Sequence, residues 1–312
     1  MPRVRGSRQF GTSKGADEQS SRKGRPGQQW LGRLALGVET RNAAAMGLTK
    51  LATRIVDKPW GRVGAGAAFG ADPARKVGEV WFEGPPGAPI AVMAKYLFTS
   101  ERLSIQVHPD DAQASALGEP GGKDECWIVL EAGDDAEIGI GMREPMSAEA
   151  LLESARDGSI VDKLDWRRPK RRDLIYNPAG TVHALGPGLT VLEIQQSNDV
   201  TYRLYDYGRD RPLHLDQAAK VARATPHSHP LDHPIVEDRS AVLVDSGPFA
   251  IAWCHRRAPA LPPVRDLQLL PIDAAVTAGE DRLLPGECAL FDGDPASLRS
   301  DGTFVLAWSP QP

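Results

Sequence analysis

The chain has 312 residues, of which 41% are hydrophobic and 25% are charged, and its formal net charge is −4. This length and composition are typical of a globular protein with a substantial core. The slight negative charge gives no overall attraction to a polyanion, so we expect no nucleic-acid partner. A small anionic substrate would therefore need a local cluster of cationic side chains.

Residues 1–46 differ in composition from the rest of the chain. They are rich in Arg, Gly, Ser and Gln and have no sustained hydrophobic periodicity, a composition typical of disorder. The apolar stretch WLGRLALGV is interrupted by Arg33, and no segment reaches membrane-spanning length, so we expect neither a secretory signal nor a membrane partner. Met46 opens a run that looks like an ordinary protein start. We interpret residues 1–46 as a disordered leader or a start-site artefact.

From residue 47 onward, short apolar runs alternate with Gly and Pro. The runs are EVWFEG, IAVMAKYLF, LSIQVH, CWIVLEA, AEIGIGM, DLIYNPAG, LTVLEIQQ and TYRLYDY. Short strands at regular spacing, separated by turn residues, predict an all-β antiparallel sandwich or barrel over residues 47–239. A weaker set of strand-like runs predicts a second, smaller β unit over residues 240–312.

One segment, residues 147–166, has a helical pattern instead. Ser147 is suited to cap a helix, an apolar stripe follows it, and Gly158 is suited to end it. The sequence therefore predicts a helix here, followed by a second short helix from Ser159 to about Trp166. Both form an excursion between strands.

Four potential metal ligands stand on three strand-like segments: Gln106 and His108 in LSIQVHPDD, Glu125 in KDECW and His183 in PAGTVHALG. Because residues two apart on a strand face the same side, Gln106 and His108 would point into one cavity. The mixed nitrogen and oxygen donors fit zinc, iron, manganese, cobalt or nickel. Such a set favours a catalytic site over a closed structural one. Taken singly, each His is more often a hydrogen-bonded core or surface residue, and the Glu a solvated strand carboxylate.

A second histidine cluster and the cysteines suggest no further site. His227, His229 and His233 have metal-like spacing but lie in a Pro-rich stretch, so we interpret this stretch as a solvated linker. The three cysteines are widely separated and have no metal or redox spacing, which favours a reducing, cytoplasmic setting. Cys126 would face away from Glu125 on a strand, and we expect both Cys126 and Trp127 in the core.

The chain resembles type I phosphomannose isomerase, the metal-dependent cupin enzyme that interconverts mannose 6-phosphate and fructose 6-phosphate. The resemblance lies in KPWGR, GEVWF, LSIQVHPDD, KDECWIVLEA, NPAGTVHALGPG and VLEIQQSNDVTYRLYDYGR; it is strong from Lys58 to Arg209 and looser beyond. It implies a cupin, or jelly-roll, barrel of the short bacterial form, with one Zn²⁺ ion or another divalent transition metal as cofactor. The implied metal ligands are Gln106, His108, Glu125 and His183.

The resemblance also implies roles for five further residues. Arg203 is expected to clamp the substrate or its phosphate, and Lys123 to act in proton transfer or electrostatic stabilisation. Lys95, Ser104 and Asp199 match substrate-binding positions. The alternative interpretation of Lys95 and Lys123 is that they are solvated strand charges. The tyrosines that flank Arg203, which are Tyr202, Tyr205 and Tyr207, are expected to pack rather than to catalyse.

One departure from the family concerns the turn Arg171-Arg172-Asp173. It stands where relatives often have Lys-Gly-Asp, so we expect a looser turn here.

The chemistry of an aldose–ketose isomerase explains why such residues occur together. Proton transfer between C1 and C2 passes through an enediol or enediolate, whose negative charge needs a cation. Cationic side chains are also needed to bind the phosphate dianion. Two alternatives stay open: another metal-dependent cupin enzyme, such as an oxygenase or epimerase, and a non-catalytic sugar-binding cupin. The oligomeric state is also left open.

Overall fold

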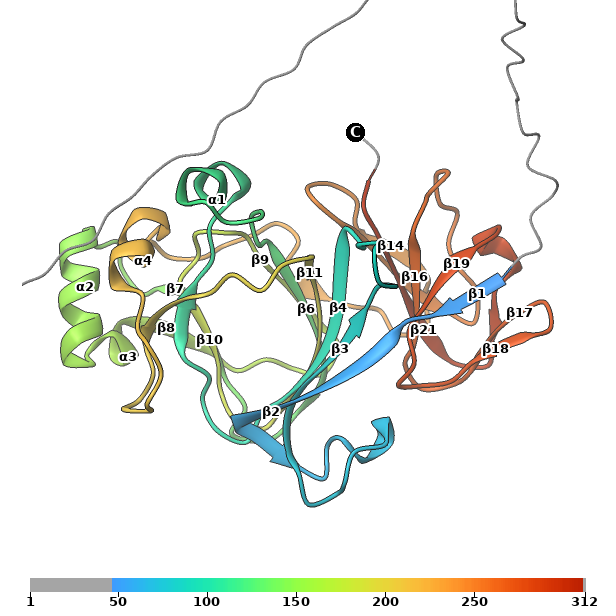
Figure 1. Ribbon diagram of the computed structural model, residues 1–312, viewed down its shortest axis with the longest axis horizontal. Coiled ribbons are helices and arrows are strands. Elements are labelled where there is room, and N and C mark those ends of the chain that lie inside the picture. Colours follow the sequence, from blue (N-terminus) through green and yellow to red (C-terminus); the bar gives the residue numbers. More distant parts are fainter. Residues whose placement is uncertain (1–46, 311–312) are drawn as a thin grey trace, which may run out of the picture. The chain divides into compact units, whose positions relative to one another are not determined.

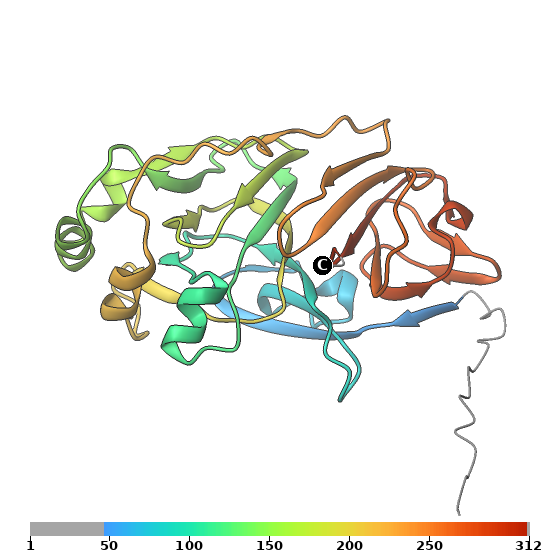
Figure 2. The same cartoon turned by 90° about the horizontal axis from the view of Figure 1, so that it is seen from above.

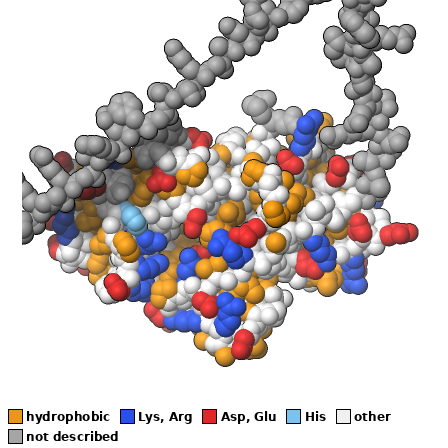
Figure 3. Space-filling model, in the orientation of Figure 1, with side chains coloured by type: hydrophobic (Ala, Val, Ile, Leu, Met, Phe, Trp, Pro, Cys, Tyr) orange, Lys and Arg blue, Asp and Glu red, His pale blue; other side chains and the backbone are white. Residues whose placement is uncertain are grey.

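Strands are the predominant regular element of the structure, a computed structural model that describes residues 47–310 (Figure 1). Every pairing between its named strands is antiparallel, as the spacing of short apolar runs predicts. The predicted leader, residues 1–46, lies outside the described residues. On the face shown in Figure 3, acidic and basic side chains are intermingled.

The largest sheet has seven strands in the order β13-β9-β6-β11-β4-β3-β2. The strands are β2 (Ala52–Val63), β3 (Lys76–Glu83), β4 (Val92–Phe98), β6 (Glu125–Ala132), β9 (Asp173–Asn177), β11 (Leu189–Gln196) and β13 (His233–Pro234). Its central strands are buried on both faces, so their sequences are nearly continuous apolar runs.

A five-stranded sheet faces it, in the order β12-β5-β10-β7-β8. The strands are β5 (Ile105–Val107), β7 (Ile138–Met142), β8 (Leu164–Arg167), β10 (His183–Leu185) and β12 (Tyr202–Tyr205). One apolar cluster contains side chains of both sheets, such as Trp127 and Val191 from the first and Ile138 and Leu185 from the second. The two sheets therefore enclose a common interior.

Helices cover the other face of the five-stranded sheet. They are α1 (Asp111–Leu117), α2 (Ala148–Asp157), α3 (Ile160–Lys163) and α4 (Leu215–Val221). An apolar cluster joins Val107 and Met142 of the sheet to Leu151 of α2 and Val221 of α4. Among the described residues, no helix has the length and apolar character needed to cross a membrane.

Both helices of the predicted excursion are present, but the second one is shorter than predicted. Ser147 Oγ accepts a hydrogen bond from the backbone N–H of Ala150, and Gly158 ends α2 with a left-handed φ of 82°. The second helix stops at Lys163, however, because the chain from Leu164 pairs with β7 and becomes strand β8. Pairing with the sheet and burial of Leu164 outweigh continuation of the helix.

The remaining strands form two smaller sheets, of six strands in the order β1-β19-β16-β21-β15-β14 and of three in the order β18-β17-β20. They are β1 (Gly47–Lys50), β14 (Ala241–Val244), β15 (Ala250–His255), β16 (Leu267–Pro271), β17 (Val276–Ala278), β18 (Asp281–Leu283), β19 (Ala289–Asp292), β20 (Arg299–Ser300) and β21 (Thr303–Trp308); two short 3-10 helices are η1 (Ala67–Phe69) and η2 (Pro295–Ser297). β1 pairs with β19, so the six-stranded sheet also contains the first described strand. The division at residue 240 stays a prediction.

The six-stranded sheet packs against the outer face of the seven-stranded sheet. Phe82, Tyr96 and Ile128 of the large sheet share one apolar cluster with Phe249 and Trp253 of the six-stranded sheet. Figure 2 shows the strands after residue 240, in orange and red, beside the earlier strands. The seven-stranded sheet thus has a core on one face and the shared interior on the other.

Candidate metal centre

Strand alternation decides which side chains of the seven-stranded sheet enter the interior. On β6, Cys126 and Ile128 face the core shared with the six-stranded sheet, whereas Glu125 and Trp127 line a cavity on the opposite face. Cys126 therefore faces away from Glu125 and is buried, as predicted. Trp127 is also buried, but it lies on the same side as Glu125 and forms part of the cavity wall.

A row of four side chains crosses four adjacent strands, and three of them, Trp127, Glu193 and Lys95, line the cavity. Cross-strand register places Trp127 opposite Glu193, Glu193 opposite Lys95, and Lys95 opposite Trp81. Lys95 Nζ lies 2.8 Å from Glu193 Oε1, and the Trp127 indole donates to Glu193 Oε2 at 2.9 Å. Lys95 is 4% exposed, so its interpretation as a solvated strand charge is wrong.

The five-stranded sheet supplies a second row. On adjacent strands, Gln106 pairs with His183 on one side and with Arg203 on the other. All nine predicted site residues except His108 line the cavity; they are Lys95, Ser104, Gln106, Lys123, Glu125, His183, Asp199 and Arg203. His108 is buried and its Nε2 atom lies 3.2 Å from Glu125 Oε1.

His108, Glu125 and His183 form a candidate metal site, with donor atoms that all lie within 4.8 Å of one another. The Nδ1 atom of His108 lies 2.8 Å from the Val200 carbonyl, and that of His183 lies 2.9 Å from the Thr181 carbonyl. These contacts assign the ring proton to Nδ1, so each Nε2 carries a lone pair.

Both of these lone pairs point toward the Glu125 carboxylate. His183 Nε2 lies 3.5 Å from Glu125 Oε2, and His108 Nε2 is buried without a hydrogen-bond partner. Three electron-rich donors therefore converge on one buried space, an arrangement that a cation stabilises. The residues fit a divalent metal ion.

The fourth predicted ligand, Gln106, lies beside this group. Its Nε2 atom lies 3.3 Å from His183 Nε2, and its Oε1 atom accepts a hydrogen bond from Ser104 Oγ at 3.2 Å. A half-turn of the amide exchanges the two atoms without changing the shape of the side chain, and it would direct Oε1 toward the histidines. Ser104, a predicted substrate-binding residue, thus contacts Gln106, a predicted metal ligand.

Two neighbours hold Glu125. Asn177, which the sequence interpretation did not single out, donates from Nδ2 to Glu125 Oε2 at 2.9 Å. Lys123 Nζ lies 3.1 Å from Glu125 Oε1 and is 2% exposed, so its interpretation as a solvated charge is wrong. Burial alone would raise the pKa of Glu125, but His108 in its protonated form and the Lys123 ammonium hold it well below its usual value.

The histidines are neutral near pH 7. Burial, reinforced by Lys123, lowers the pKa of His108 to about 3, and burial is also the main cause that lowers the pKa of His183. A neutral imidazole pair beside an ionised carboxylate has the protonation state that metal binding requires.

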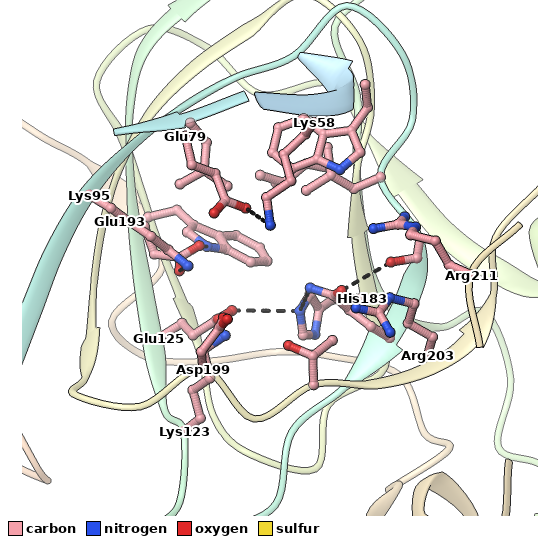
Figure 4. A pocket seen from close by; sticks show the side chains of 18 residues that line it. Lys58, Glu79, Lys95, Lys123, Glu125, His183, Glu193, Asp199, Arg203 and Arg211 are labelled. Atoms are coloured by element: carbon pink, nitrogen blue, oxygen red, sulfur yellow. Dashed lines mark hydrogen bonds and ion pairs between the residues drawn. The ribbon is translucent and has the colours of Figure 1, made fainter. Parts of the chain in front are cut away.

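The cavity contains more charge than the sequence interpretation assigned to it. Figure 4 shows four additional charged residues among those that line it: Lys58, Glu79, Glu193 and Arg211. Lys58, Glu79 and Glu193 belong to the motifs KPWGR, GEVWF and VLEIQQ, so the signal was present without an assigned role. Asp199, a predicted substrate-binding residue, lines the same cavity but is exposed.

Arg203 lies at the cavity with a free donor. Its Nε is buried without a partner, and its pKa is lowered by burial and by the nearby Arg211 guanidinium. Arg211 is fixed by two hydrogen bonds to Asp206, each 2.6 Å long. The predicted packing role of the tyrosines that flank Arg203 is confirmed, because Tyr202, Tyr205 and Tyr207 belong to the helix-covered cluster.

The prediction of a solvated linker at His227, His229 and His233 is wrong. His227 is buried and its Nε2 lies 2.9 Å from Asp232 Oδ2, while His229 stacks on Tyr176 with ring centroids 4.6 Å apart. His233 pairs with β9 as part of β13. Specific side-chain contacts hold this Pro-rich segment against the sheet.

The expectation of a looser turn at Arg172 is also wrong. Arg172 adopts a left-handed φ of 73°, and its N–H donates to the Val129 carbonyl at 2.7 Å. The guanidinium lies 4.5 Å from the centre of the Trp253 ring and 2.9 Å from Glu237. These contacts offset the strain that a non-Gly residue incurs in this conformation.

Comparisons with known proteins identify the family of the chain. No family model matches the chain. The mannose-6-phosphate isomerase ManA of Bacillus subtilis is 34% identical over 208 residues, which is 63% of this chain and 64%, or just under two thirds, of that protein. The probable mannose-6-phosphate isomerase GmuF of the same organism is 33% identical over 223 residues, 58% of this chain and 70% of that protein. This chain belongs to the mannose-6-phosphate isomerase family. Another member, from Streptococcus mutans, is 41% identical over 147 residues, 43% of this chain and 46% of that protein.

Solved structures agree on the fold of the mannose-6-phosphate isomerase family. The mannose 6-phosphate isomerase of Bacillus subtilis superimposes with a TM-score of 0.68 at 24% identity, covering 83% of this chain and 99% of that one. A variant of phosphomannose isomerase from Salmonella typhimurium gives a TM-score of 0.64 at 14% identity, covering 85% of this chain and 100% of that one.

Proposed function

We propose that this protein interconverts mannose 6-phosphate and fructose 6-phosphate in the cavity between the five- and seven-stranded sheets, with a divalent metal held by Gln106, His108, Glu125 and His183. The observation that carries the proposal is the convergence of two Nε2 lone pairs on the buried Glu125 carboxylate. Several cationic side chains line the same cavity, so a dianionic sugar phosphate can bind beside the metal.

Zinc is the proposed ion. A mannose 6-phosphate isomerase with zinc bound has the same fold, with a TM-score of 0.63, although only 14% of its aligned residues are identical. Mixed nitrogen and oxygen donors that leave room for substrate are typical of catalytic zinc sites. When bound, the ion would polarise the sugar carbonyl and stabilise negative charge on the enediolate oxygens.

The other charged residues are proposed to bind and orient the substrate and to move the proton. Arg203 has an unpartnered buried donor and would bind the phosphate, with Asp199 at the exposed edge. Lys123 would stabilise negative charge beside Glu125. Burial and Glu125 raise the pKa of Glu193 despite the opposing Lys95, which brings this carboxyl closer to the range of a general base at neutral pH.

We further propose that the two facing sheets form the cupin-type barrel that the sequence predicts, since they enclose one apolar cluster and one cavity. A cytoplasmic location is proposed because Cys126, Cys254 and Cys288 are all buried free thiols, which suit a reducing compartment.

A coupled assay on mannose 6-phosphate tests the proposal, with the protein as purified, treated with a chelator, and remetallated with Zn²⁺. We expect turnover that is lost with the metal and restored with it. Turnover that is unchanged in chelator would contradict the metal assignment. Binding of the sugar phosphate by the metal-loaded protein without turnover would indicate a non-catalytic cupin instead.

A further inference from the structure

Strand β2 contains a bulge that brings Lys58 into the cavity. Its pairing with β3 runs regularly up to Val56 opposite Glu79, then both Asp57 and Arg62 pair with Val77. Residues 58–61 therefore have no partner on β3. Lys58 and Trp60 of this bulge both line the cavity.

Two glycines make room for the bulge. A Cβ atom on Gly78 would lie 2.5 Å from Lys58 Cβ, and one on Gly61 would lie 2.6 Å from the backbone nitrogen of Gly78. Both distances are far shorter than a non-bonded contact, so any larger residue would displace the bulge. The position of Lys58 therefore depends on these two glycines.

The partner of Lys58 is Glu79, a carboxylate to which the proposed metal centre gives no role. Glu79 is 7% exposed; its Oε2 accepts a hydrogen bond from the Trp81 indole at 2.6 Å, and its Oε1 lies 3.4 Å from Lys58 Nζ. Burial would raise its pKa, but Lys95 and Lys58 lower it below the usual value, so the carboxylate is ionised. A buried carboxylate repels a phosphate and accepts hydrogen bonds from hydroxyl groups.

Figure 4 shows where this pair lies. Glu79 and Lys58 are on one side of the cavity, Lys123 and Asp199 on the opposite side, and Arg203 and Arg211 on a third side. Lys95 and Glu193, the proposed base, lie on the fourth side and are paired with each other at 2.8 Å. If the reacting carbons lie between the metal centre and Glu193, and the phosphate lies at the arginines, the remaining hydroxyl groups of the sugar face Glu79 and Lys58.

We propose that Glu79 and Lys58 form a subsite that binds the unreactive hydroxyl groups at C3 and C4 of the sugar phosphate, and that Glu79 determines specificity for them. This inference rests on the proposed function. Glu79 accepts a hydrogen bond from one hydroxyl group, while Lys58 donates to the neighbouring oxygen. Trp81 holds the carboxylate in place, so the subsite exists before the substrate binds.

A cycle of variants and substrates tests the subsite. We compare the wild type with Glu79→Gln, which keeps the shape of the side chain, on mannose 6-phosphate and on its 3-deoxy and 4-deoxy analogues. A hydrogen bond to a charged group is typically worth about 10- to 100-fold in rate or affinity. We expect kcat/KM of the wild type to fall by about this factor on at least one analogue. On that analogue, kcat/KM of Glu79→Gln should lie within about threefold of the wild-type value, because the hydrogen bond is already absent.

Matched controls lie on the same strand. Glu83→Gln and Lys76→Met remove exposed charges at the two ends of β3 and should leave kcat/KM unchanged. Gly78→Ala changes no charge but displaces Lys58, so it should reproduce the loss caused by Lys58→Met. Equilibrium binding of mannitol 6-phosphate, which has no carbonyl to isomerise, gives the same comparison without turnover.

The outcomes separate this inference from the proposed function. If the wild type isomerises mannose 6-phosphate but Glu79→Gln matches it on every substrate, the subsite is wrong and the function stands. The subsite is also wrong if Glu79→Gln and removal of the hydroxyl group each lower kcat/KM and the two factors multiply when they are combined. If the wild type does not isomerise the sugar phosphate, the function itself fails. Metal content and circular dichroism of each variant identify any that do not fold. If Glu79→Gln does not fold, equilibrium binding of mannitol 6-phosphate to Lys58→Met decides whether the subsite exists.

Discussion

At each predicted histidine ligand, one ring nitrogen is already committed to the backbone. His108 and His183 both direct Nδ1 toward a carbonyl oxygen and both leave Nε2 facing Glu125. The backbone thereby fixes the tautomer and the ring orientation before any ion binds. This explains how a site assembled from three distant segments can have a single geometry.

Substitution of a ligand and of a substrate-binding residue should have different effects. We expect His108→Ala to lose bound metal and activity together, because it removes a donor from the centre. Arg203→Ala should keep its metal but lose turnover by at least about 100-fold, because we propose that the partly buried guanidinium binds the substrate rather than the metal. Metal content by mass spectrometry and kcat/KM are measured on both. His108→Ala protein that retains metal and activity would refute the ligand assignment.

The buried histidines should also make stability depend on pH in the metal-free protein. The pKa of His108 is about 3 in the folded state against 6.5 as the usual value, so the unfolded state binds this proton more readily. The histidine therefore contributes stability above about pH 6.5, and this contribution is lost as the pH falls toward 3. The slope is at most about 1.4 kcal/mol per pH unit for each such group.

Urea unfolding at pH 6.5, 5.5 and 4.5 in the presence of a chelator measures this slope. His108→Gln cannot bind the proton, so its free energy of unfolding should decline less steeply than that of the wild type. Parallel curves for the two proteins would show that His108 is protonated equally in the folded and unfolded states.

At the scale of strands, the cavity wall depends on register. The row Trp127, Glu193, Lys95 and Trp81 exists because β6, β11, β4 and β3 are adjacent and in step. A shift of one residue on β4 would turn Lys95 into the apolar core and Tyr96 into the cavity. Correct pairing of these strands is therefore a condition for the charge arrangement of the cavity.

Breaking the ion pair in this row should cost stability. We expect Lys95→Met to lower the free energy of unfolding by about 3 kcal/mol, because Glu193 is left buried without its cation. Lys95→Met with Glu193→Gln should recover part of this loss, since no unpaired charge remains. Lys76→Met, which breaks an exposed pair with Glu101, should cost under about 1 kcal/mol. Equal losses for Lys95→Met and Lys76→Met in urea unfolding would contradict the argument.

The same strands explain what the sequence could and could not predict. The predicted ligands Gln106, His108 and His183 could be found from the sequence because each lies in a short motif. Helix α2 could be found because it has a capping residue and an apolar stripe. Glu79 and Glu193 were missed because their strands are buried on both faces, where alternation alone does not distinguish the core side from the cavity side. Their roles depend on register between strands far apart in the chain.

At the scale of the whole molecule, the seven-stranded sheet connects the site to the C-terminal strands. One face carries Glu79, Lys95, Glu125 and Glu193 into the cavity, and the other packs on the six-stranded sheet through a shared apolar cluster. Arg172 adds a polar contact across this interface by stacking on Trp253. The sheet that positions the cavity residues is therefore covered on its outer face by strands that contribute nothing to the cavity lining.

Removal of the C-terminal strands should therefore affect the site indirectly. A chain that ends at residue 239 would expose Phe82, Tyr96, Ile128 and their neighbours in the shared cluster, an apolar surface that a monomeric protein rarely leaves uncovered. We expect this truncated chain to aggregate and to bind little metal, although it keeps every predicted ligand. The full chain should unfold in one step, with tryptophan fluorescence and loss of activity following the same urea curve. A soluble, metal-binding fragment ending at residue 239 would show instead that the region before residue 240 folds on its own, and that the shared cluster is an interface between independent domains.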